Sequence, residues 1–220
     1  MSEIFTPRVG TRAYFSSYQL WASGHLIELA TKIESTHTGK SKFDIRQRTY
    51  VANSILSSVS FMEAAVNELF QDASDNHDSY IKSLSTDKIA SLSGFLGTTE
   101  EHKLSVVEKY NRALKLCKIQ QFDKGSNPYQ KADLVTKLRN VIVHYRPETR
   151  YADETSKLER LLNGKFDLNP LITTEGNPLF PDRFLGSNCA IWARDSCKLL
   201  ADEFFSKLGI KPNYQRVSFE

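Results

Sequence analysis

The sequence has 220 residues, of which 40% are hydrophobic and 25% are charged, and its formal net charge is +3 at pH 7. This length fits one domain with an elaborated loop, and the balance of apolar and charged residues argues against both an intrinsically disordered chain and a membrane protein. The small basic surplus is too weak to indicate nucleic-acid binding by itself, although it is compatible with a local basic groove.

The N-terminal segment lacks a charged stretch followed by an apolar run and a small-residue cleavage site, and no segment reaches the roughly 18 uninterrupted apolar residues that span a membrane. We therefore expect a cytoplasmic protein that does not associate with membranes. The three cysteines and five histidines are scattered along the chain. Their spacing predicts reduced thiols, no disulfide framework and no metal cofactor.

The N-terminal half is predicted to consist of helices. Residues 1–10 are expected to form a loose arm. Apolar residues at helical intervals then predict a first helix over residues 12–34 and a long second helix over residues 43–72, with a turn rich in Gly, Ser and Thr between them. Further helices are expected over the following segments: 78–84, 87–92 and 99–117.

The next helix has the best-marked boundaries in the sequence. Asn127 is a candidate N-cap, Pro128 suits the first helical position, and Gln130 lies three residues after the cap. The helix is expected to end near Tyr145, because Pro147 disfavours helical geometry at the residue before it. We therefore predict a helix over residues 128–145.

The C-terminal part combines a long loop with a closing helix. A short helix is expected over residues 153–162, and glycines and prolines then predict an irregular loop over residues 163–182. An amphipathic helix follows over residues 187–208 and should end at Gly209. Ser187 is expected to take part in the cap of that helix. The sequence thus predicts one all-α domain over residues 1–220, a helical bundle with short extra helices and a long loop before the C-terminal helix.

Polar side chains gather on one side of the predicted helix 128–145. At about 100° per residue, Asn140 and His144 project away from the apolar face of this helix, and Arg139 lies at the flank of that side, from which its long side chain can swing toward them. Asn140 and His144 are four residues apart, so they stack one turn above the other. This side is either ordinary solvent surface or a contact site that another helix, from this chain or from a second copy, could cover. The apolar face comprises Leu134, Leu138, Val141, Ile142 and Tyr145.

This polar set contains the components of metal-free phosphodiester cleavage. A histidine can both take and give a proton near physiological pH, and the dipole at the end of a helix favours the protonated imidazole of His144. An arginine such as Arg139 can hold a phosphate and stabilise the charge that develops on it. RNA supplies its own nucleophile, the ribose 2′-OH. The spacing also fits an alternative interpretation, a surface arginine beside a helix-capping histidine.

The segment from Leu138 to Tyr145 resembles the signature of the HEPN family (higher eukaryotes and prokaryotes nucleotide-binding domain): Arg, a polar residue, three further residues and His, near the end of a helix. Residues 60–68 resemble the long second helix of that family, and residues 191–205 resemble its closing helix. The resemblance implies an all-α bundle that forms a homodimer, with two Arg/His sets facing each other across a cleft.

Many HEPN proteins are metal-independent endoribonucleases of toxin–antitoxin, phage-defence or RNA-processing systems. The resemblance therefore implies that this protein cleaves RNA without a cofactor, with Arg139, Asn140 and His144 as catalytic residues and an antitoxin or nucleotidyltransferase-like protein as a possible partner. Other members bind nucleotides or partners without cleaving, and this remains the alternative. Some toxin members carry Tyr two residues after the His, whereas here Tyr145 directly follows His144 and Arg146 takes the later position.

Three further expectations concern residues outside that segment. Glu63 falls within an apolar stripe, where a carboxylate is costly unless it is paired, so we hypothesise that it orients the helix of Arg139 and His144, with Asn67 beside it. The alternative is a glutamate at the edge of the stripe that reaches solvent. Trp21 and Trp192 are expected in the core. A basic run between residues 103 and 124 fits either a solvated face or a surface for an RNA backbone.

Overall fold

The computed structural model describes residues 10–149, 151 and 154–218, and this part of the chain contains helices and no strand. The predicted all-α class is therefore confirmed for the described residues. The expected loose arm over residues 1–10 lies, except for Gly10, outside them. None of the described helices is both long and apolar enough to cross a membrane.

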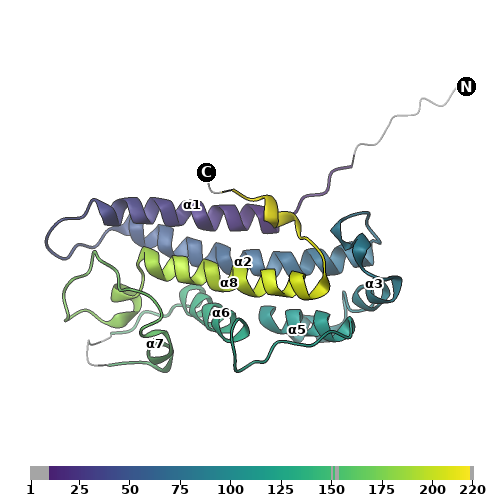
Figure 1. Ribbon diagram of the computed structural model, residues 1–220. Coiled ribbons are helices and arrows are strands. Elements are labelled where there is room, and N and C mark those ends of the chain that lie inside the picture. Colours follow the sequence, from purple (N-terminus) through teal and green to yellow (C-terminus); the bar gives the residue numbers. More distant parts are fainter. Residues whose placement is uncertain (1–9, 150, 152–153, 219–220) are drawn as a thin grey trace, which may run out of the picture.

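Three long helices lie side by side along the length of the molecule: α1 (Phe15–Ser35), α2 (Ile45–Ser74) and α8 (Ser187–Leu208) (Figure 1). Small hydroxyl side chains let α1 and α2 approach closely, because the Ser23 Oγ lies 3.2 Å from the Ser54 Oγ and 2.7 Å from the Ser58 Oγ. These bonds satisfy buried polar groups without a bulky side chain between the helices. All three predicted helices are present; α1 and α2 have slightly shifted ends, whereas α8 has the predicted bounds.

Shorter helices lie against one side of α2 and α8 (Figure 1). Two of them, α5 and α6, pack beneath the long helices, while α3 and α7 lie toward opposite ends. The helical segments other than the three long helices are η1 (Tyr80–Ser83), α3 (Thr86–Ser93), α4 (Thr99–Lys103), α5 (Val106–Leu116), α6 (Tyr129–Val143), α7 (Lys157–Leu162), η2 (Leu179–Arg183) and η3 (Asn213–Arg216).

The single helix predicted over residues 99–117 is wrong, because α4 and α5 are separate helices. Ser105 forms a reciprocal capping box with Glu108, whose carboxylate accepts from the Ser105 amide at 3.0 Å. This cap starts a new helix and stops the preceding one. The helix predicted from residue 153 likewise begins later, at Lys157, after a second capping box between Ser156 and Glu159; residue 153 itself lies outside the described residues.

Helix α6 is shorter at both ends than the predicted helix 128–145. Pro128 rather than Asn127 occupies the N-cap position, and no side chain caps the helix there. At the other end His144 is the C-cap, and its amide donates to the Asn140 carbonyl at 2.9 Å. His144 therefore lies just past the last helical turn instead of within it.

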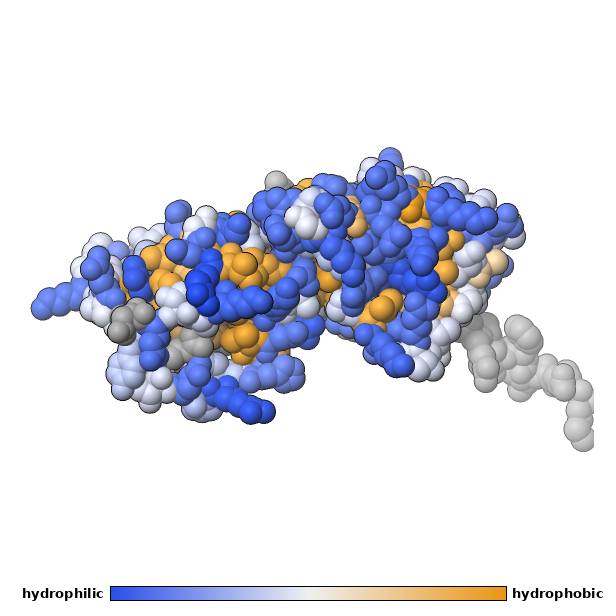
Figure 2. All heavy atoms as spheres, turned by 90° about the horizontal axis from the view of Figure 1, so that it is seen from below, coloured by the Kyte–Doolittle hydropathy of each residue, from blue (hydrophilic) through white to orange (hydrophobic). Residues whose placement is uncertain are grey.

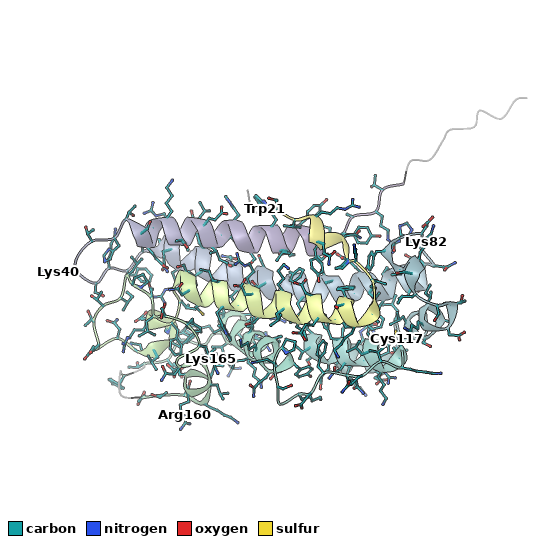
Figure 3. The ribbon with its side chains drawn as sticks, viewed as in Figure 1. Trp21, Lys40, Lys82, Cys117, Arg160 and Lys165 are labelled. Atoms are coloured by element: carbon teal, nitrogen blue, oxygen red, sulfur yellow. The ribbon has the colours of Figure 1, made fainter. Side chains whose placement is uncertain are left out.

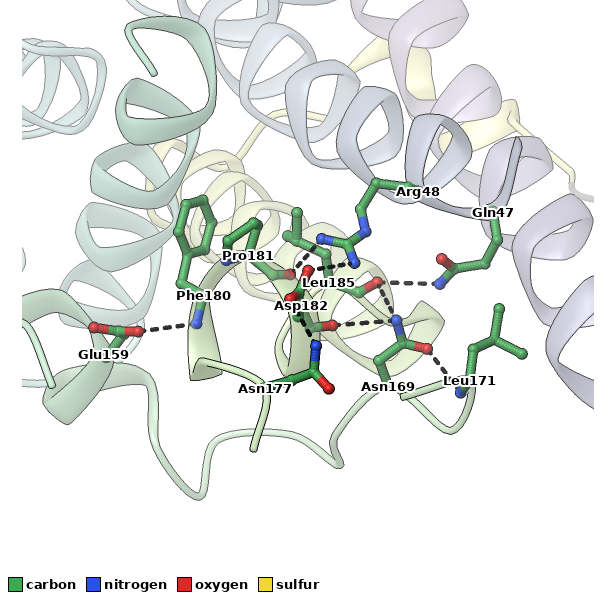
Figure 4. Close-up of polar contacts among 10 residues, drawn as sticks. All are labelled: Gln47, Arg48, Glu159, Asn169, Leu171, Asn177, Phe180, Pro181, Asp182 and Leu185. Atoms are coloured by element: carbon green, nitrogen blue, oxygen red, sulfur yellow. Dashed lines mark hydrogen bonds and ion pairs between the residues drawn. The ribbon is translucent and has the colours of Figure 1, made fainter. Parts of the chain in front are cut away.

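The predicted loop over residues 163–182 is irregular for most of its length and is fastened to α2 (Figure 4). The Arg48 guanidinium donates to the Pro181 carbonyl at 2.7 Å and to the Asp182 carboxylate at 3.1 Å. Leu171 and Phe180 of this loop are buried. The loop is thus a fixed part of the fold that covers one end of the bundle.

The start of α8 is stabilised differently from the prediction. Gly186 takes the N-cap position, and Ser187 is the first helical residue without a side-chain cap of its own. Instead, the carboxylate of Glu34, at the end of α1, accepts from the Ser187 amide at 2.7 Å and from the Ser187 hydroxyl. A negative charge at this position interacts favourably with the positive end of the dipole of α8.

The two tryptophans differ in their surroundings. Trp192 is partly buried against the core, in line with the prediction. Trp21 is 48% exposed on the outer face of α1 (Figure 3), so its predicted burial is wrong. Its ring stacks on that of His25. The three cysteines are free and buried.

Candidate functional site

A shallow hollow of about 450 Å³ lies at the C-terminal end of α6. Its lining residues come from α6, from the segment after it and from the 163–182 loop; they are Asn140, Val141, His144, Tyr145, Arg146, Glu148 and Phe180. The molecule seen from below shows apolar surface gathered over the half that contains α6 and α7, whereas the half under α5 is mostly hydrophilic (Figure 2). The hollow therefore combines a few polar groups with apolar surroundings.

The polar groups of the hollow are accessible. Asn140, His144 and Arg146 are exposed, and His144 stands where the helix ends. The side chains of Val143 and Tyr145 beside them are 48% and 44% exposed. The Tyr145 ring lies 6.3 Å from the ring of buried Phe180, centroid to centroid, so the loop supports one wall. The site offers an imidazole, an amide and a guanidinium to a ligand.

Arg139 does not line this hollow. It is half-buried, and its Nε is enclosed without a hydrogen-bond partner among the described residues. Arg139 is also close enough to Cys197 of α8 to act on it electrostatically. Burial raises the pKa of the Cys197 thiol, and the positive charge of Arg139 opposes that rise. Arg139 thus lies on the flank of α6 that faces α8, as its predicted flank position allows, but its side chain does not swing toward the hollow.

Glu63 and Asn67 lie on α2 and do not reach the hollow. Glu63 is half-buried and makes no hydrogen bond or ion pair with any described residue, so the hypothesised bond to Arg139 is absent. The Asn67 carbonyl oxygen accepts from the Lys109 ammonium at 3.0 Å, and Lys109 also pairs with the buried Glu101 at 3.1 Å. Asn67 therefore belongs to a polar contact with α5, away from α6.

The basic run between residues 103 and 124 does not form one solvated face. Lys109 is buried, while Arg112 pairs with Glu100 at 2.7 Å and Lys124 with Glu108 at 3.5 Å. These pairs neutralise part of the run. These contacts argue against a surface along this segment that binds an RNA backbone.

Sequence reasoning identified Asn140, His144, Tyr145 and Arg146, which the fold brings together, but not Phe180 or Glu148. Contact between the loop and the end of α6 could not be read from either segment alone. Among the described residues, no group of three His, Cys, Asp or Glu side chains is arranged to hold a metal ion.

Comparison with protein-family models, with curated proteins and with solved structures gives no match for this sequence or fold. The residues around the hollow and the motif that they form are therefore the features that bear on function.

Proposed function

We propose that this protein is a metal-independent endoribonuclease of the HEPN type that acts on RNA as a homodimer, as a toxin or phage-defence effector. The observation that carries the proposal is the exposed grouping of His144, Asn140 and Arg146 around one hollow at the end of α6. An imidazole can transfer a proton, and an amide and a guanidinium can stabilise charge on a phosphate, so these groups together can support RNA cleavage without a metal.

In the proposed reaction, His144 accepts the proton of a ribose 2′-OH, and the 2′-oxygen attacks the adjacent phosphorus. The bond to the 5′-oxygen breaks, that oxygen takes a proton from water, and a 2′,3′-cyclic phosphate remains; the protonated His144 returns its proton to the solvent. Asn140 and Arg146 donate hydrogen bonds to the phosphate oxygens, on which negative charge develops. Arg139 contributes to this step only if its guanidinium turns away from α8.

The proposed dimer pairs the exposed end of α6 with the same surface of a second copy. Val143 and Tyr145 present apolar area next to His144, and a two-fold interface uses one patch on both subunits. Such pairing would place two His144 side chains in one cleft. The same surface is where we would expect an antitoxin or nucleotidyltransferase-like partner to act, because covering it blocks the site.

The test is cleavage of a mixed RNA pool in EDTA by wild type, His144→Ala and the control His102→Ala, an exposed histidine on α4. We expect wild type and His102→Ala to leave cyclic or 3′-phosphate ends, and His144→Ala to lose about 10²–10⁴-fold in rate. Circular dichroism checks that the variants are folded. Equal rates for wild type and His144→Ala would refute the assigned role of His144.

A second candidate is a HEPN-like binding module that does not cleave. The position of Arg139 favours it, because a guanidinium that faces α8 is not in contact with the hollow. For this module we expect wild type and His144→Ala to bind RNA or a protein partner without any cleavage. If a folded dimer binds RNA or a protein partner and gives no RNA cleavage products, the binding module is the correct candidate.

A further inference from the structure

A second and larger cavity, of about 660 Å³, lies at the end of the molecule where α1 leads into α2. Figure 3 labels one of its residues, Lys40, in this connection. Leu171 of the 163–182 loop closes one side, and the Lys42 amide donates to the Leu171 carbonyl at 2.8 Å. The cavity shares no lining residue with the hollow around His144.

Positive charge is concentrated in this cavity. Four cationic side chains line it (Lys32, Lys40, Lys42 and Arg46), against a single carboxylate, that of Asp44. The lining therefore carries a formal charge of +3, which is as large as the formal net charge of the whole chain. Arg46 bonds to Asp44 at 3.0 Å, whereas the three lysine ammonium groups pair with no acidic group among the described residues. Three exposed, unpaired cations in one concavity attract a polyanion.

The cavity is also lined by apolar side chains and by a histidine. Leu29, Ile33, Tyr50 and Leu171 supply apolar surface. His37 also lines the cavity, and its Nε2 is enclosed without a hydrogen-bond partner among the described residues. An enclosed ring nitrogen without a partner is uncommon in folded proteins, because it loses its bonds to water.

We propose that this cavity binds a small molecule that carries phosphate groups on an apolar body. The phosphate groups contact Lys32, Lys40 and Lys42, since ammonium groups form strong charge-assisted hydrogen bonds with phosphate. The apolar body lies against Leu29 and Ile33. Binding sites for small molecules commonly combine such apolar walls with a few convergent polar groups. This site is independent of the proposed ribonuclease activity.

The test uses isothermal titration calorimetry with three probes on the full chain: ATP, inorganic tripolyphosphate and adenosine. We expect ATP to bind with a micromolar dissociation constant, tripolyphosphate to bind at least about tenfold more weakly, and adenosine not to bind detectably. Equal binding of ATP and tripolyphosphate would overturn the proposal, because it would indicate a plain anion site. The absence of ATP binding at about 1 mM would overturn it as well.

Two double variants locate the site. Lys40→Ala/Lys42→Ala removes two cations of the cavity but keeps the backbone bond of Lys42 to the loop. We expect it to weaken ATP binding by at least about tenfold. The control Lys115→Ala/Lys211→Ala removes the same charge from exposed positions outside the cavity and should change binding less than about twofold. Equal losses in both variants would overturn the proposed location.

A last comparison separates the cavity from the hollow. His144→Ala should bind ATP as wild type does, whether or not it cleaves RNA. A loss of ATP binding in His144→Ala would place the ligand at the end of α6 and overturn the proposal. Failure of RNA cleavage by wild type would leave the expected ATP binding unchanged.

Discussion

The substitution Glu34→Ala tests how the three long helices are held together at one end. The Glu34 side chain is nearly buried, with 9% of the residue exposed. One of its oxygens accepts from the Gln47 amide of α2 and from the Ser187 backbone amide of α8, both at 2.7 Å, and the other accepts from the Ser187 hydroxyl. A single carboxylate at the end of α1 thus joins α1, α2 and α8.

The expected loss in the free energy of unfolding follows from these bonds. A hydrogen bond to a charged group contributes about 1.5–3 kcal/mol, and the substitution removes three of them while leaving the Ser187 amide unpaired. Burial of the Glu34 carboxylate costs desolvation free energy, and the substitution removes this cost, which offsets part of the loss. Gln47 also keeps its bond to the Leu185 carbonyl at 3.1 Å. We therefore expect Glu34→Ala to lose about 3 kcal/mol.

Urea denaturation followed by circular dichroism measures this loss. We expect Glu34→Gln, which retains an acceptor but no charge, to lose about half as much. The control Glu28→Ala lies on the same helix, is exposed, and should change stability by less than about 0.5 kcal/mol. A loss below about 1 kcal/mol for Glu34→Ala, with an unchanged denaturant slope, would refute the reasoning.

Three more predictions concern other contacts. Lys109→Met leaves the buried carboxylate of Glu101 without its ammonium partner, and we expect a loss of about 3–4 kcal/mol in urea denaturation. Hydrogen bonds from the Arg46 guanidinium hold the pKa of Asp44 at about 2, below its ordinary value of 3.8. The stability that this carboxylate contributes is therefore complete above pH 3.8 and is lost as the pH falls toward 2; Asp44→Asn should remove this part of the acid dependence. Val143→Asp should convert the proposed dimer to a monomer in light scattering.

Each of these predictions has a control or a contrary outcome. Lys115→Met, at an exposed position on α5, should leave stability nearly unchanged. An Asp44→Asn protein with the same acid dependence as wild type would contradict the effect of Arg46. Leu199→Asp, at a 41% exposed position on α8, should keep the dimer. A Val143→Asp protein that remains dimeric would place the interface elsewhere.

Much of the helical architecture is determined by local sequence. The apolar periodicity of α1, α2 and α8 predicted these helices, and Gly209 ends α8 in the left-handed conformation expected of a C-cap, with φ of +73°. Two errors also had local causes. The capping boxes Ser105–Glu108 and Ser156–Glu159 are visible in the sequence as Ser and Glu three residues apart, and they set the true starts of α5 and α7.

The candidate site depended on tertiary structure to a larger extent. The exposure of Asn140 and His144 followed from helical periodicity, because a side chain's direction on its own helix is a local property. The direction of Arg139 was decided by α8, a helix far along the chain that covers that side of α6. In the same way, Glu34 meets Ser187, and Leu171 closes a cavity between α1 and α2. Periodicity fixes the face on which a residue lies, but only the packing of distant segments decides what that face meets.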